Sequence, residues 1–169
     1  MSYFAAAVAR TEQGWTAREL DLDDIDDIES LAEELREITG DGPGPALLLL
    51  EENDEYVAVV RVDGGVGALQ EPRVFLSDRR AVQASEVAAM LWEDADVDAL
   101  DDAEDDADDE GIRAVSEPVG DAELLADLGV TASDLVALCA EEGLLPADVL
   151  TALCVRAGCA DVLEELREA

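Results

Sequence analysis

Hydrophobic and polar positions in the first part of the chain predict strands joined by short turns. Residues 2–10 are largely apolar and end near a turn at Gly14, and residues 15–22 then alternate like the second strand of a hairpin. Residues 46–50 are wholly apolar, which is typical of a strand buried on both faces. Two further strands are predicted from the β-branched and aromatic residues at 56–62 and 73–77.

Helical spacing appears twice among these strands. Apolar residues three and four apart predict one amphipathic helix, which Asp23 or Asp24 would cap: Ile25, Ile28, Leu31, Ala32, Leu35 and Ile38. A shorter helix is predicted for residues 85–92, with Ser85 as its cap. Because neighbouring strands are joined by short connections, the fold class is α+β: a small, mainly antiparallel sheet with helices on one face.

The last part of the chain is predicted to be helical. Gly129, Gly143 and Gly158 divide it, and Pro146 is suited to the first turn of a helix. The predicted helices are residues 122–128, 132–142, 146 to about 158, and 160–167. A bundle this short is marginally stable alone, and docking on the sheet would stabilise it.

An acidic stretch separates the two parts. Residues 93–110 hold 12 acids and no base, so like charges repel at each i,i+4 step of any helix there. We predict a solvated linker, with a marginal helix as the alternative. The predicted division is a sheet domain at 1–92, an acidic linker at 93–111 and a C-terminal helical domain at 112–169.

The charged residues of the chain limit the reactions and the binding partners that it can have. It carries 44 acids against 10 basic residues, all arginine, for a net charge of −34, and it has no histidine. Histidine bases and lysine nucleophiles are therefore excluded, and direct binding to nucleic acid is disfavoured because that affinity depends on cationic side chains. Hydrophobic residues still make up 49% of the chain, enough for a core. Solvation in a salty cytoplasm and a GC-rich genome are a rival explanation for the acid excess.

Candidate metal and catalytic groups favour structural roles. The acids at 23–27 and 51–55 lack the spacing of a calcium loop and suit a helix N-terminus and a polar turn. Cys139, Cys154 and Cys159 have neither a zinc nor a redox spacing, and we expect buried thiols in a reducing cytoplasm. The apolar start, residues 1–8, is too short to span a membrane and lacks a basic leader. We predict a cytoplasmic protein with no cofactor and no catalytic activity.

One group of arginines stands out as a candidate partner-binding site. Arg73, Arg79 and Arg80 flank an apolar segment that contains Phe75. An arginine can anchor a carboxylate or a phosphate of a partner through paired hydrogen bonds. The alternative is internal neutralisation, in which each arginine pairs with a nearby acid.

Several ordered strings of residues lie along the chain outside the acidic stretch. They begin at residues 2, 14, 54, 60, 72, 118, 124 and 139 and read SYFAA, GWTARE, DEY, VRVDG, PRVFLSD, PVGD, LLADLG and CAEEGLLPAD. Together these strings resemble the actinobacterial family of tRNA adenosine deaminase-associated proteins. The resemblance implies a neighbour of the deaminase rather than the enzyme, since the H-x-E and C-x-x-C zinc motifs of such deaminases are absent from the sequence. It supplies no active-site residues.

Three hypotheses follow. The first is an accessory protein that binds the tRNA adenosine deaminase or another tRNA-processing protein, with its acids facing a basic surface. The second is a tRNA mimic, in which the acids at 93–110 occupy the partner's RNA groove and inhibit it. The third is a small-molecule or metal sensor that uses Arg73, Arg79 and Arg80. We favour the first.

Overall fold

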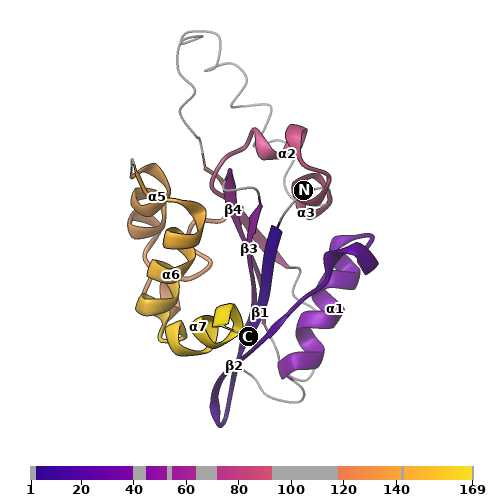
Figure 1. Cartoon of the computed structure of the whole chain (residues 1–169), viewed down its shortest axis with the longest axis vertical. Coiled ribbons are helices and arrows are strands. Elements are labelled where there is room, and N and C mark those ends of the chain that lie inside the picture. Colours follow the sequence, from indigo (N-terminus) through magenta and orange to yellow (C-terminus); the bar gives the residue numbers. More distant parts are fainter. Residues whose placement is uncertain are drawn as a thin grey trace, which may run out of the picture.

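The computed structural model describes residues 3–39, 45–52, 55–63, 72–92, 118–141 and 143–168. A six-stranded sheet lies at the centre of the molecule, with its strands in the order β2-β1-β3-β4-β5-β6 and every neighbouring pair antiparallel. Helices pack on both sides of this sheet (Figure 1). The strands are β1 (Tyr3–Thr11), β2 (Gly14–Glu19), β3 (Pro45–Glu52), β4 (Tyr56–Asp63), β5 (Arg73–Leu76) and β6 (Val119–Gly120).

The central strands are buried on both faces, as the apolar run in β3 predicted. Leu48 and Leu50 face one core, whereas Leu47 and Leu49 face the other. The β3–β4 register pairs Leu48 with Val60, which lies on the same face. Because side chains alternate along a strand, an unbroken aliphatic sequence supplies both cores at once.

The first core lies between the sheet and the helices near the N-terminal part of the chain. These are the 3-10 turn η1 (Leu22–Asp24), α1 (Ile28–Thr39), α2 (Ala81–Ala84) and α3 (Glu86–Trp92). The predicted apolar stripe of α1 is confirmed, with Leu31 and Leu35 fully buried. The helix begins later than predicted. Asp21 caps the start of η1 by accepting a hydrogen bond from the Asp23 amide, and Asp27, just before α1, accepts one from the Ser30 amide at 2.7 Å.

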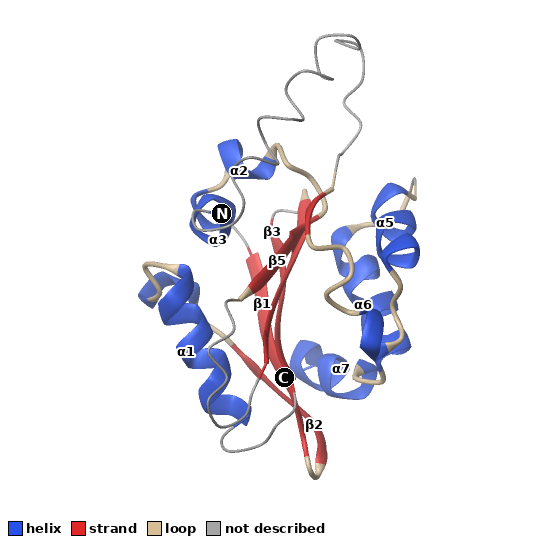
Figure 2. Ribbon diagram, turned by 180° about the vertical axis from the view of Figure 1, so that it is seen from behind, coloured by secondary structure: helices blue, strands red, loops and turns tan. Residues whose placement is uncertain are grey.

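The C-terminal helices cover the second face of the sheet. They are the 3-10 turn η2 (Ala126–Leu128), α5 (Ala132–Ala140), α6 (Pro146–Ala157) and α7 (Ala160–Glu168). Leu150 and Leu153 of α6 and Leu163 of α7 join the core beneath Leu47, Leu49 and Val59. Figure 2 shows the resulting three layers, with α1–α3 on one side of the strands and α5–α7 on the other. The α+β class is confirmed, and docking of the C-terminal helices is what buries the second face.

The α-helix predicted for residues 122–128 is wrong. The Asp121 carboxylate accepts a hydrogen bond from the Glu123 amide and forms a turn there. The carbonyl of Leu124, which an α-helix would pair with the Leu128 amide, instead accepts a hydrogen bond from Arg61 at 2.6 Å. The Leu128 amide bonds to Leu125, three residues back, so the segment closes as the short turn η2.

The predicted acidic linker at 93–111 lies outside the described residues. The division at 1–92, 93–111 and 112–169 stays a prediction. On the far side of that stretch, β6 pairs with β5 through Gly120 and Phe75, so the C-terminal part contributes an edge strand to the sheet. No helix among the described residues is long and apolar enough to cross a membrane.

Candidate partner-binding site

The three arginines of the predicted site lie at two ends of one strand. Arg73 begins β5, whereas Arg79 and Arg80 follow its last residue and lead into α2. A strand of four residues is roughly 13 Å long. The structure therefore separates Arg73 from the other two.

Phe75 has no surface to offer a partner. It is 1% exposed and packs in the core between the sheet and the C-terminal helices. Alternation along β5 turns it toward that core, and its backbone pairs with Gly120 of β6. The Phe75 ring is therefore part of the interior, and it does not form the surface contact with a partner that the sequence predicted.

Two of the arginines are paired with acids, as the alternative reading of the sequence proposed. Arg73 lies 3.2 Å from the Asp121 carboxylate. Arg80 donates to both carboxylate oxygens of Asp78, with its closest nitrogen at 2.7 Å. Their use by a partner stays a prediction, as it does for the partly exposed Arg79.

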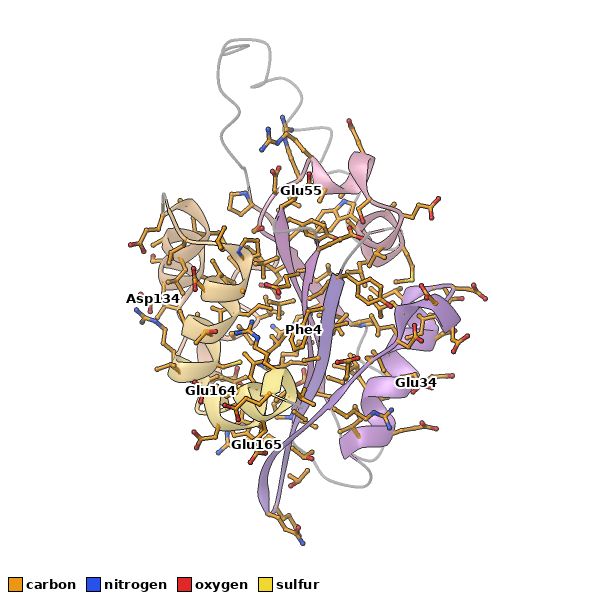
Figure 3. The ribbon with its side chains drawn as sticks, in the orientation of Figure 1. Phe4, Glu34, Glu55, Asp134, Glu164 and Glu165 are labelled. Carbon is orange, nitrogen blue, oxygen red and sulfur yellow. The ribbon has the colours of Figure 1, made fainter. Side chains whose placement is uncertain are left out.

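A pocket lies beside Arg80, where the end of the sheet meets α2 and α3. Its volume is about 330 Å³, and its lining residues are Glu55, Tyr56, Asp78, Arg80, Ala81 and Ser85. Glu55 stands at the sheet end nearest α2 in Figure 3. Glu55 and Arg80 are exposed at the rim, and the other four residues are buried. The pocket thus has a charged rim and a polar floor.

Local capping interactions build this pocket. The Asp78 side chain accepts a hydrogen bond from the Arg80 amide at 2.9 Å, and its carbonyl accepts one from Ala81, which turns the chain from β5 into α2. Ser85 accepts the Ala88 amide through its hydroxyl at 3.2 Å and caps α3, as predicted. These two turns hold Asp78 and Ser85 against the end of β4.

A buried relay of hydrogen bonds lies behind the floor. The Tyr56 hydroxyl donates to Glu52 at 3.1 Å and lies 3.2 Å from the Ser85 hydroxyl. Glu52 is 4% exposed, so the phenol is the donor that this carboxylate needs. Burial, with the neighbouring Glu52 charge, raises the pKa of Tyr56 well above its usual range, and the phenol stays protonated at neutral pH.

A second polar group lies on the opposite side of the sheet. The buried Arg61 guanidinium contacts Asp63, Asp127 and the carbonyl of Leu124. Its hydrogen bonds to Asp127 lower the pKa of that carboxyl. Sequence reasoning missed this role, although an arginine inside an apolar strand is itself a signal for a buried ion pair. The contacts of Arg61 with Leu124 and Asp127 hold the C-terminal part against β4.

The cysteines fit the expected structural role. Cys154 and Cys159 are buried, and Cys139 is half-buried. Burial raises the pKa of the Cys139 thiol to about 12, so it is protonated and unreactive at neutral pH. Within the described ranges, no group of three or more His, Cys, Asp or Glu residues is arranged to hold a metal ion.

The fold and the pocket define a small acidic α+β protein, with one sheet between two helical layers. The chain belongs to the Rv3753c-like tRNA adenosine deaminase-associated protein family, whose sequence model matches residues 3–160. The matched range contains both polar groups described above, and it confirms the family resemblance seen in the sequence. No curated protein and no solved structure matches the chain.

Proposed function

We propose that this chain is a non-catalytic accessory protein that binds a tRNA adenosine deaminase or another tRNA-processing protein in the cytoplasm. The observation that carries the proposal is an acidic exterior in a member of a deaminase-associated family. A tRNA-binding protein needs a basic surface, and an acidic protein is its electrostatic complement.

The distribution of charge supports this. Residues 21–37 hold nine acids and one arginine, and the acids there lie on the outer side of η1 and α1. Glu34 marks this layer in Figure 3, and Asp134 and Glu164 mark the opposite one. Acids on both outer layers produce a negative field that would speed encounter with a basic partner.

The absence of histidine and lysine from the sequence supports the non-catalytic part of the proposal. Activation of a serine or cysteine nucleophile normally uses one of these two side chains. The effect on the partner would therefore come from binding.

The test is co-purification and sedimentation of this chain with the tRNA adenosine deaminase of the same organism. We expect a complex at low ionic strength whose dissociation constant rises as NaCl is raised from 50 to 300 mM. An unrelated acidic protein of similar charge is the control, because non-specific attraction would retain it equally. A mixture that sediments as two separate species at low ionic strength would refute the proposal.

Mimicry of tRNA is a second candidate, which the 12 acids without a base at 93–110 favour. In that case the chain competes with tRNA for the deaminase. A variant with these acids replaced by Asn and Gln keeps the length of the stretch and removes its charge. Inhibition of deamination that persists unchanged in this variant would exclude mimicry by the acidic stretch while leaving an accessory role intact.

A further inference from the structure

We infer that the pocket lined by Glu55, Tyr56, Asp78, Arg80, Ala81 and Ser85 receives a cationic side chain, arginine or lysine, of the protein partner. The inference rests on the proposed function, in which that partner is basic. It assigns the contact to one place on the surface.

The hydroxyl donors on the floor of the pocket are already used. The single hydroxyl hydrogen of Tyr56 goes to Glu52, so Ser85 must donate its own hydrogen to the Tyr56 oxygen. At the rim, two of the three guanidinium nitrogens of Arg80 donate hydrogen bonds to Asp78. The floor therefore offers mainly acceptor oxygens, which match a ligand that only donates, and arginine and lysine side chains are of that kind.

The charges of the pocket select the same ligand. Arg80 cancels the charge of Asp78, which leaves the exposed carboxylate of Glu55 at the rim and that of Glu52 behind Tyr56. The charges of both carboxylates would repel an anion. A cation instead gains a partner in Glu55 and acceptors below it.

The volume also limits the ligand. About 330 Å³ is near the lower end of the range for small-molecule pockets, roughly 300–1,000 Å³. A single extended side chain fits this space, with its charged end between the exposed Glu55 carboxylate and the acceptors of the floor.

The first experiment uses a probe of defined chemistry. N-acetylarginine amide and N-acetylcitrulline amide have the same shape, but only the first carries a charge. Titrated into the full chain and followed by NMR, the arginine probe should shift the amides of Glu55, Ala81 and Ser85 saturably, and the citrulline probe should not. Equal shifts with both probes, or none with arginine, would overturn the inference.

The second experiment uses the deaminase complex and matched charge changes. We expect Glu55→Gln to weaken binding about fivefold, the upper range for an exposed ion pair, whereas Glu37→Gln on α1 removes the same charge elsewhere and changes binding less than twofold. Arg80→Gln frees Asp78 and should strengthen binding, while Arg18→Gln on β2 is its matched control. Far-UV circular dichroism and thermal unfolding confirm that each variant is folded.

The outcomes separate this inference from the proposed function. A deaminase complex that Glu55→Gln and Glu37→Gln weaken equally would refute the pocket and leave the accessory role standing. A pocket that binds the arginine probe in a chain that never binds the deaminase would refute the proposed partner. Pocket shifts that appear on raising protein concentration alone would identify a second copy of the chain as the occupant and overturn the assignment.

Discussion

Single side chains join distant parts of this molecule, and Arg61 is the clearest case. Its side chain is 6% exposed and binds two carboxylates and one carbonyl, of which Asp127 and Leu124 come from the far side of the acidic stretch. A buried guanidinium is tolerated when its donors are satisfied in this way. The C-terminal part is thus fixed to the sheet by charge as well as by apolar packing.

Asp127→Asn should therefore destabilise the protein in a pH-dependent manner. The pKa of Asp127 is lowered in the folded state, so its stabilisation is present above the unfolded value of about 3.9 and is lost as pH falls through the folded pKa. Since the carboxylate is 62% exposed and screened by solvent, we expect a cost of about 1 kcal/mol at pH 7. Urea unfolding at pH 7 and pH 3 measures it. Asp134→Asn, in the exposed pair with Arg156, is the control, and a cost for Asp127→Asn that is equal at both pH values would contradict the argument.

Tyr56→Phe should lower the free energy of unfolding by more than the loss of one hydroxyl group suggests. The change removes one hydroxyl, but it leaves the buried carboxylate of Glu52 without its phenol donor. We expect a loss of about 1–3 kcal/mol in the free energy of unfolding. Tyr3→Phe is the matched control, because its hydroxyl donates to the exposed Asp21 and accepts from the Leu22 amide, so its removal leaves no buried carboxylate without a donor. Equal losses in chemical denaturation would show that Glu52 does not depend on Tyr56.

At the scale of elements, β6 is two residues long and depends on one glycine. Gly120 has φ +102°, and a Cβ there would lie 2.1 Å from the Val74 carbonyl oxygen. The next amide, that of Asp121, donates to the same oxygen at 2.9 Å. A side chain at position 120 would therefore push β6 away from β5.

Gly120→Ala should cost at least about 3 kcal/mol, because strain from positive φ adds to the clash with backbone. Gly143→Ala separates the two effects. Its φ is +91°, yet nothing lies within 4 Å of the added Cβ, so only the conformational cost of about 1–2 kcal/mol applies. Urea unfolding of both variants by circular dichroism tests this. If Gly143→Ala were as destabilising as Gly120→Ala, the close approach at β6 would have no energetic weight.

Elements with a clear period could be predicted from the sequence, and those fixed by tertiary contacts could not. The alternating and apolar strands and the stripe of α1 follow from side-chain period alone. The two-residue β6 has no period, and the segment at 122–128 has helical composition that Arg61, distant in sequence, overrides. The starts of α5 and α6 and the end of α6 were accessible because Thr131, Pro146 and Gly158 mark them, whereas α5 ends at Ala140, two residues before the predicted end.

The candidate site was predicted only in part for a similar reason. Arg80 was selected because it is one of few bases in an acidic chain, and it does line the pocket. Phe75 was selected by its neighbours in sequence, whereas burial depends on which helices cover the sheet. Glu55 and Tyr56, at the start of β4, lie far in sequence from Ser85, which precedes α3, so nothing in the spacing indicates that they meet.

At the scale of the whole molecule, the net charge of −34 should make stability depend on salt. Like charges on a compact chain repel, and the Debye length falls from about 10 Å at 0.1 M salt to about 3 Å at 1 M. We expect the free energy of unfolding to rise by on the order of 2 kcal/mol over this range, which corresponds to roughly 4–8 °C in Tm. Thermal unfolding in NaCl and KCl measures the effect, with sucrose as a non-ionic control.

Salt should act on the proposed deaminase complex in the opposite direction, because screening weakens attraction between unlike surfaces as it weakens repulsion within one. Measuring both quantities on the same samples distinguishes the two explanations of the acid excess. If the charge serves solvation alone, NaCl stabilises the fold and no salt-sensitive complex forms. If it serves recognition, Tm rises while affinity falls, and Glu55→Gln flattens the salt dependence of affinity without changing that of Tm.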